Sequence, residues 1–467
     1  MPKLNRRTFL KLLGQGSAAL GLGMGLSGKA MAKTGSTGSR NVRYQTFQPG
    51  EYFDWEREMV EERFALAKKG PQRGSSESMN RSGGPVDPLK PVTEEDILNY
   101  NRKWDPYNPL FNNKEYAQKA GYPGVPAWPC FQRPSGSHSH LTIPEDYTDK
   151  YIWLYGHGPD DIEMFSHIFA DDYFTAETKE ISLEDITIQG SDLRHFRCSS
   201  TAEMYNRKGE LVVRSSNCLR NGYKRIIDGS PYPSYSQLKS AFTEDLHPAH
   251  YTTDEEWEYI KELWRKEYTR GSQKLYWEDV TIGDEPAWVC SNPISYMDMI
   301  GWYGFNRMDP RPLLLKTPLK KLNEFRDRFG NILMYIPQMY GTRNIVGSRC
   351  VMYNDTAAKV ITRLVTNYIG DAGLTTRIGW MFQQNYPEMR YAREGGEYLD
   401  KVSYMKGKGC NAHGSEGDTV IGKGYVTNKY KNDKGEGIID LVCWGETLDN
   451  RIITVVPAAA KLPLKKG

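Results

Sequence analysis

The chain has 467 residues, of which 25% are charged and 39% are hydrophobic, and its 61 basic and 58 acidic side chains give a formal net charge of +3. Nucleic-acid binding needs a basic face that displaces counterions from phosphate. The near-balanced charge therefore argues against a nucleic-acid partner and against a polybasic membrane patch. The length is sufficient for two or three ordinary domains.

The first 32 residues have the layout of an export signal. A basic start precedes an apolar stretch at 12–26, and Ala30 to Ala32 form a small-residue cleavage site, which predicts cleavage after Ala32. A membrane anchor is the alternative. However, the apolar stretch contains five glycines and is shorter than the roughly 20 apolar residues that a stable span needs.

Paired arginines lie directly before this apolar stretch. The segment 5–11, with Arg6 and Arg7, resembles the twin-arginine signature, which a translocase reads on proteins that are already folded. The sequence therefore predicts a signal peptide at 1–32, a periplasmic mature protein, and the twin-arginine translocase as a partner.

Seven cysteines are scattered without a CxxC motif or a Cys/His spacing, so we expect no metal site and no cofactor. Most should be buried small side chains. An exported chain could form disulfides, but an odd number leaves at least one thiol free. The cysteines are Cys130, Cys198, Cys218, Cys290, Cys350, Cys410 and Cys443.

Residues 33–91 are polar and broken by Gly, Ser and Pro, with one amphipathic stretch at 54–69. This composition predicts an extended N-terminal arm with one helix. Ordered structure should begin at 92, where Thr93 can cap a helix that carries Ile97 and Tyr100.

Two regions alternate polar and apolar residues with a period of two, which is typical of half-buried strands. The first lies at 174–225 and the second at 417–456. The segments AEMYNRKGELVVRSS at 202–216 and WGETLDNRIITVVPA at 444–458 place turn and strand at matching offsets. We therefore predict an α+β chain with an internal duplication.

The copies should occupy 92–228 and 275–467, joined by a helical connector at 229–274. Within this connector, Thr253 and Glu256 form a capping box for a helix expected to reach Arg270, before Gly271.

The stretch YNPLFNNKEYA at 107–117, followed by AGYPGVP at 120–126, resembles the MaoC-like acyl dehydratases, the hydratase branch of the hot-dog fold. The segments YWEDVTIGD at 276–284, TNYIGD at 366–371 and GDTVIGKGYV at 417–426 resemble parts of the second repeat in two-domain members. The resemblance implies two tandem hot-dog domains, each an antiparallel sheet wrapped around a central helix, in a pseudo-symmetric double hot dog.

Active members of this family carry an Asp and a His in a D-x-N-P-x-H pattern. This sequence keeps Asn108 and Pro109, but it has Pro106 in place of the Asp and Phe111 in place of the His. Neither replacement can transfer a proton. Asp105, one residue away, could take the acidic role if the loop shifts its register.

The second repeat offers no replacement, because MDPRP at 308–312 contains no histidine. His138 and His140 lie on a loop that could close over the pocket mouth, so the catalytic candidates are Asp105, Asn108, His138 and His140. An H-x-H metal site lacks further ligands nearby. Core or surface roles are expected for His157, His167, His195 and His413. The resemblance implies that Pro109, Phe111, Gly121 and Tyr122 contact the substrate.

Two functions remain open. One is a carbon–oxygen lyase of the hydratase/dehydratase type acting on a small activated-carbonyl (acyl) compound. Coenzyme A thioesters are cytoplasmic metabolites, so an exported enzyme should use another ester. The other is a non-catalytic protein that binds a small ligand or serves as the partner subunit of an exported complex. A homodimer or a co-exported partner protein is compatible with both.

Overall fold

The computed structural model describes residues 41–44, 53–59, 61, 91–131, 151–185, 193–225, 250–294, 354–380, 414 and 417–465. The predicted signal at 1–32 and the loop with His138 and His140 lie outside these residues. Within them, no helix is both long enough and apolar enough to cross a lipid bilayer.

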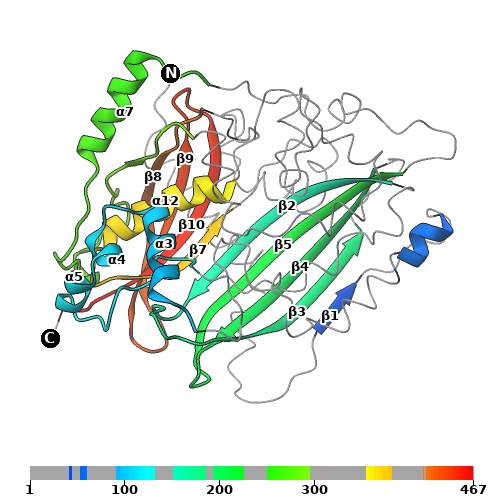
Figure 1. Cartoon of the computed structure of the whole chain (residues 1–467), viewed down its shortest axis with the longest axis horizontal. Helices are drawn as coiled ribbons and strands as arrows, with labels where there is room; N and C mark the ends of the chain where they lie inside the picture. The colour runs from blue at the N-terminus through cyan, green and yellow to red at the C-terminus, as the bar shows by residue number, and fades with distance from the viewer. Residues whose placement is uncertain are drawn as a thin grey trace.

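The described strands form a ten-stranded sheet in the order β1-β3-β4-β5-β2-β7-β10-β9-β8-β6 (Figure 1). All neighbouring strands are antiparallel except β1 and β3. The strands are β1 Asn41–Tyr44, β2 Tyr151–Met164, β3 Thr175–Asp185, β4 Leu193–Tyr205, β5 Leu211–Arg225, β6 Val289–Cys290, β7 Leu374–Trp380, β8 Ile421–Lys431, β9 Gly437–Glu446 and β10 Ile452–Leu462.

This strand order is symmetric about the contact between β2 and β7. In each half, one strand pairs with the last strand of a three-strand meander: β2 with β5, and β7 with β10. The β4–β5 hairpin therefore corresponds to the β9–β10 hairpin. These are the two segments whose sequences match at equal offsets, so the topology agrees with the predicted duplication.

Local sequence explains the tight turns of these meanders. Asn206 Oδ1 accepts hydrogen bonds from the backbone N–H groups of Lys208 and Glu210, each at 3.0 Å. Gly209 follows with a φ of 76°, a conformation that glycine adopts without steric cost. Asn432 forms the same turn between β8 and β9.

Helix α12 (Asn354–Ile369) lies across the second set of strands and contacts β7, β8, β9 and β10 (Figure 1). Its core-facing side chains are fully buried, among them Ile361, Leu364 and Val365. Polar residues of the same helix, among them Lys359 and Thr362, are also buried, so other elements enclose the helix on most sides. The expected α+β fold, with an antiparallel sheet around a central helix, is therefore confirmed and is seen most clearly in this half.

Three short helices precede β2: α3 (Glu94–Trp104), α4 (Pro109–Asn112) and α5 (Lys114–Lys119). Thr93 caps α3 as predicted, because its Oγ1 accepts a 3.1 Å hydrogen bond from the N–H of Asp96. Asp96 bonds back to the Thr93 N–H, which completes a capping box. Helix α3 contacts α12, and α4 contacts α3 and α5, which brings the motif segment to the junction of the two halves.

Helix α7 (Asp254–Lys266) begins at the predicted capping box of Thr253 and Glu256. It ends four residues before the expected Arg270, because Glu267 adopts an extended backbone. The Glu267 carboxylate forms an ion pair with Arg363 of α12, at 2.8 Å. That contact explains why the chain leaves the helix early.

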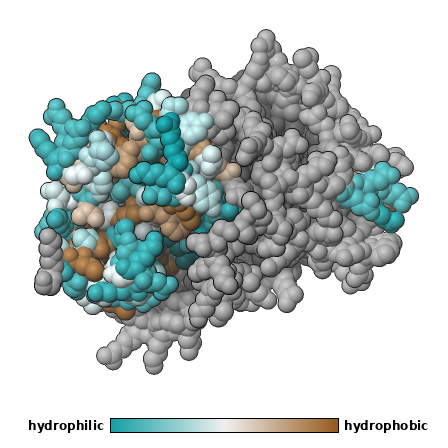
Figure 2. Space-filling view, turned by 90° about the horizontal axis from the view of Figure 1, so that it is seen from below, coloured by the Kyte–Doolittle hydropathy of each residue, from teal (hydrophilic) through white to brown (hydrophobic). Residues whose placement is uncertain are grey.

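The N-terminal arm contributes one strand that the sequence did not predict, since β1 pairs in parallel with β3. On the face seen in Figure 2, the described residues carry apolar side chains in small groups among polar ones. Such scattered groups are normal for a protein surface. This face therefore shows no large apolar patch that would mark a binding surface among the described residues.

Candidate functional site

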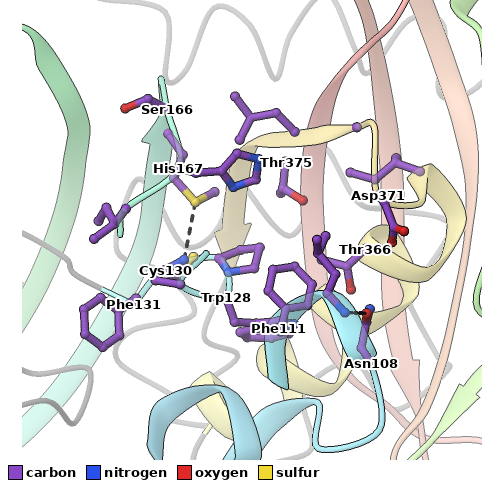
Figure 3. A pocket seen from close by; sticks show the side chains of 18 of the residues that line it. Asn108, Phe111, Trp128, Cys130, Phe131, Ser166, His167, Thr366, Asp371 and Thr375 are labelled. Atoms are coloured by element: carbon purple, nitrogen blue, oxygen red, sulfur yellow. Dashed lines mark hydrogen bonds between the residues drawn. The ribbon is translucent and has the colours of Figure 1, made fainter. Parts of the chain in front are cut away.

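A pocket lies where the motif segment meets the end of α12 and the start of β7 (Figure 3). Its cavity volume is about 30 Å³, and the pocket is partly open to solvent. Both halves of the chain supply its walls. The lining residues include Asn108, Phe111, Trp128, Cys130, His167, Thr366, Asp371 and Thr375.

The first wall is apolar and comes from α4 and the chain that follows α5. Asn108 caps α4, because its Oδ1 accepts a 3.1 Å hydrogen bond from the N–H of Leu110. Buried Asn101 donates to the carbonyl oxygens of Phe111, at 2.6 Å, and Pro126, at 3.0 Å. These bonds fix Phe111 in the wall.

Trp128 and Cys130 continue this wall, and a buried aromatic cluster supports them. Trp128 stacks on Trp104 with a centroid distance of 6.4 Å. Cys130 has a φ of 62°, which is uncommon for a non-glycine residue. Its carbonyl accepts a 2.9 Å hydrogen bond from the hydroxyl of Tyr100. Lys359 of α12 in turn donates to that hydroxyl at 2.8 Å, which ties this wall to the second half.

The second wall is polar and has two facing parts. His167, just past the end of β2, lies in one of them. The imidazole is half-buried and packs edge-on against Tyr122, with a centroid distance of 5.1 Å. Burial, together with the nearby charge of Lys461, lowers the pKa of His167 to about 4. The side chain is therefore neutral at pH 7, with one ring N–H to donate and one ring nitrogen to accept.

Asp371 lies across the pocket, just past the end of α12. Gly370 ends the helix with a φ of 65°, and a Cβ there would lie 2.8 Å from the carbonyl oxygen of Gly271. The Asp371 carboxylate accepts a 2.8 Å hydrogen bond from the hydroxyl of Tyr116, and its main-chain carbonyl accepts one of 2.5 Å from Tyr122.

Burial raises the pKa of Asp371, although the bond from Tyr116 opposes the shift. A carboxylate with a raised pKa is a better proton acceptor than a free one. Asp371 is therefore suited to accepting a proton inside the pocket.

Asp105, the acidic candidate from the sequence, is buried but does not line this pocket. Burial raises its pKa to about 6, while Arg363 and the side chains of Asn108 and Trp128 lower it in part. Its Oδ2 has no hydrogen-bond partner among the described residues. Asp105 hydrogen-bonds with Asn108 of the apolar wall, and the charges of Arg363 and Glu267 shift its pKa in opposite directions.

The other predicted residues differ in position. Asn108 and Phe111 line the pocket, whereas Pro109, Gly121 and Tyr122 do not. Tyr122 acts indirectly, through its contacts with His167 and Asp371. Gly121 has a φ of 96°, and a Cβ there would meet nothing within 4 Å. His138 and His140 lie outside the described residues.

Sequence reasoning missed His167 and Asp371 as site residues. The sequence predicts a core or surface role for His167. It predicts no role for Asp371, which is only the last residue of the segment 366–371 that resembles part of the second repeat. The two residues meet because β2 and β7 pair, with Ile162 opposite Ile378 and Glu163 opposite Arg377. Pairing over so long a sequence separation has no local signal. A raised or lowered pKa at a pocket residue, visible only in the structure, marks such candidates.

The sequence matches no family model and no curated protein. Among solved structures, it is similar to a MaoC-like dehydratase at 14% identity, over 80% of this chain and 96% of that chain, with a TM-score of 0.42.

A conserved hypothetical protein from Mycobacterium tuberculosis, described as having a double hot-dog fold, matches at 11% identity, over 82% of this chain and 99% of that chain, with a TM-score of 0.39. A MaoC-like dehydratase from Phytophthora capsici matches at 9% identity, over 81% of this chain and 94% of that chain, with a TM-score of 0.32. Similarities at TM-scores below 0.5 do not assign an activity to this chain.

Proposed function

We propose that this protein is a hydratase/dehydratase-type lyase that adds water to, or removes it from, a small acyl compound in the pocket beside Asn108. The observation that carries the proposal is the presence of Asp371 and His167 in the same pocket as Asn108 and Phe111 (Figure 3). The motif positions lack proton carriers, and the second wall of the pocket supplies them instead.

In the hydration direction, Asp371 accepts a proton from water while the water oxygen bonds to the β-carbon. The electron pair of the carbon–carbon double bond moves towards the carbonyl and forms an enolate. Asp371 then returns the proton to the α-carbon. Nothing is oxidised or reduced, so one carboxylate with a raised pKa is sufficient for both proton transfers.

The lining of the pocket fits this proposal. Phe111, Trp128 and Phe131 supply apolar surface for the carbon chain. The walls would exclude much of the bulk water, which strengthens charge interactions inside.

A second candidate function is binding without turnover. The observation that favours it is Phe111, which replaces a proton carrier with buried apolar surface in the pocket wall. Such a protein would hold the same acyl ligand and release it unchanged. The two candidates differ in one measurable property, which is loss of the substrate double bond.

Purified mature protein should be incubated with the crotonyl thioester of N-acetylcysteamine, and separately with crotonyl coenzyme A, while the enoyl absorbance is followed. The lyase proposal expects turnover of the shorter ester. Binding of the ester by calorimetry, without absorbance change at high protein concentration, would support the second candidate and contradict the lyase.

We also propose that the twin-arginine translocase exports the chain to the periplasm and that the signal is cleaved after Ala32. The support is the sequence at 1–32, with Arg6 and Arg7 before a glycine-rich apolar stretch. Replacing both arginines with lysine should leave the protein in the cytoplasmic fraction. Export of that variant at the normal level would contradict the proposal.

A further inference from the structure

Thr375, at the start of β7, carries a hydroxyl that has no hydrogen-bond partner among the described residues. The side chain is only 3% exposed and lines the pocket. A buried hydroxyl without a partner destabilises the fold, and most such groups in native proteins are paired. This hydroxyl therefore needs an explanation, and its position offers one.

Other buried hydroxyls without partners do not line the pocket. Thr454 on β10 is fully buried and Thr419 precedes β8. Neither belongs to the pocket wall. Thr375 differs from them because an empty space adjoins it, so a bound molecule could supply the missing hydrogen bond. Thr454 thus provides a matched control within the same chain.

His167 and Thr375 both line the pocket. Glu163 of β2 pairs with Arg377 of β7, so His167, shortly after Glu163, and Thr375, shortly before Arg377, come from the ends of two neighbouring strands. Figure 3 shows the imidazole and the Thr375 side chain on the same side of the pocket, with Asp371 across from them. A hydroxyl and a neutral imidazole can each donate one hydrogen bond.

We infer that Thr375 and His167 together hold the carbonyl oxygen of the acyl substrate, facing Asp371 across the pocket. This inference rests on the proposed lyase function and names the part of the substrate that each wall receives. The ligand class is a small, uncharged acyl group whose carbonyl oxygen accepts two hydrogen bonds.

The arrangement also accounts for the charge that develops during the reaction. Negative charge moves onto the carbonyl oxygen when water adds to the β-carbon, and donors fixed around that oxygen stabilise it. A neutral imidazole serves as a hydrogen-bond donor without giving up its proton, which is a known catalytic use of histidine. Water then occupies the remaining space beside Asp371.

The test uses two probes that differ only in the carbonyl group. Crotonyl N-acetylcysteamine has a thioester carbonyl, whereas crotyl N-acetylcysteamine thioether has a methylene at that position. Calorimetry should measure both affinities for the wild-type protein, for Thr375→Val, for Thr375→Ser and for the control Thr454→Val. Valine replaces the hydroxyl with a methyl group of the same shape.

Wild type and Thr454→Val should bind the thioester about a hundredfold more tightly than the thioether, as expected for two hydrogen bonds to the oxygen. Thr375→Val should lose about tenfold of this preference without a lower unfolding temperature and keep the part that His167 contributes, whereas Thr375→Ser should retain the full preference. The carbonyl infrared band of the bound thioester should shift to lower frequency in wild type and less in Thr375→Val.

An unchanged preference in Thr375→Val, or no binding of either probe to wild type, would overturn the inference. Failure of the lyase proposal has a different signature. In that case the thioester preference depends on Thr375 as expected, but no protein, wild type included, removes the double bond.

Discussion

The two walls of the pocket were built in different ways. The apolar wall, with Phe111 and Trp128, comes from one continuous stretch of chain held by Asn101 and by the Asn108 cap. The polar wall, with His167, Thr375 and Asp371, is assembled where the two halves of the sheet join. The motif segment therefore supplies the shape of the pocket, whereas the junction of the halves supplies its titratable and hydrogen-bonding groups.

The largest effect should come from the polar wall. Asp371→Asn should lower kcat about a thousandfold, which is about 4 kcal/mol, because the amide cannot accept the proton from water. Asp440→Asn is the matched control, since burial also raises the pKa of Asp440, which lies on β9 outside the pocket. Steady-state hydration kinetics check both variants. A loss in Asp371→Asn no greater than in the control would remove Asp371 from the mechanism.

Truncation of the apolar wall should change stability rather than chemistry. Phe111 is 4% exposed, and Phe111→Ala should lower the free energy of unfolding by about 3 kcal/mol through lost burial and a residual cavity. The rate per folded molecule should stay within about tenfold. Phe111→Leu, which keeps most of the volume, should cost far less. Urea denaturation and active-site titration would measure the two properties; a stable but inactive Phe111→Ala protein would contradict the division between the walls.

Asp105, which hydrogen-bonds with Asn108 of the apolar wall, should affect stability in a pH-dependent way. Its pKa is raised from 3.8 to about 6 in the folded chain, so the folded state favours the protonated form. Stability is therefore lost as the pH rises from about 4 to 6. Asp105→Asn should be more stable than wild type by up to about 3 kcal/mol at pH 7, and the gain should vanish below pH 4.

Denaturant unfolding of both proteins at pH 4 and pH 7 measures this difference. The amide introduced by Asp105→Asn keeps the size of the side chain but carries no ionisable group, so the variant serves as its own control across the two pH values. A gain of equal size at both pH values would show that the buried charge is not the cause.

The smallest effect should come from Tyr122, which contacts both His167 and Asp371. Tyr122→Phe removes the hydroxyl that bonds to the carbonyl of Asp371 but keeps the ring against His167. The loss should be about 1 kcal/mol of stability and less than tenfold in kcat. Tyr205→Phe, which also removes a bonded hydroxyl but lies away from the pocket, controls for stability alone. A kcat loss as large as that of Asp371→Asn would make Tyr122 part of the chemistry.

Local patterns predicted much of the fold. The period-two segments form β4, β5, β8, β9 and β10. The Thr93 cap and the capping box at Thr253 start α3 and α7 as expected. These features depend on residues within a few positions of one another. The predicted end of α7 at Arg270 was wrong, because the chain leaves the helix where Glu267 forms an ion pair with Arg363 of the distant helix α12.

The candidate site was harder to predict for the same reason. Asn108 and Phe111 could be placed beside a pocket because the motif that contains them is continuous. His167 and Asp371 come from different halves, and only the β2–β7 pairing brings them together. Their pKa values are shifted by burial, which sequence does not report. Asp105 precedes a proline, as a turn residue would, yet it is 4% exposed.

Isotope labelling tests the central claim, that this pocket adds water to an acyl double bond, most directly. Wild-type protein, Asp371→Asn and Asp440→Asn should be incubated with crotonyl N-acetylcysteamine in H₂¹⁸O and in D₂O, and the products analysed by mass spectrometry. We predict ¹⁸O at the β-carbon and deuterium at the α-carbon with wild type and Asp440→Asn, and incorporation of both labels about a thousandfold more slowly with Asp371→Asn. Absence of both labels with wild type, or equal labelling by Asp371→Asn, would contradict the claim.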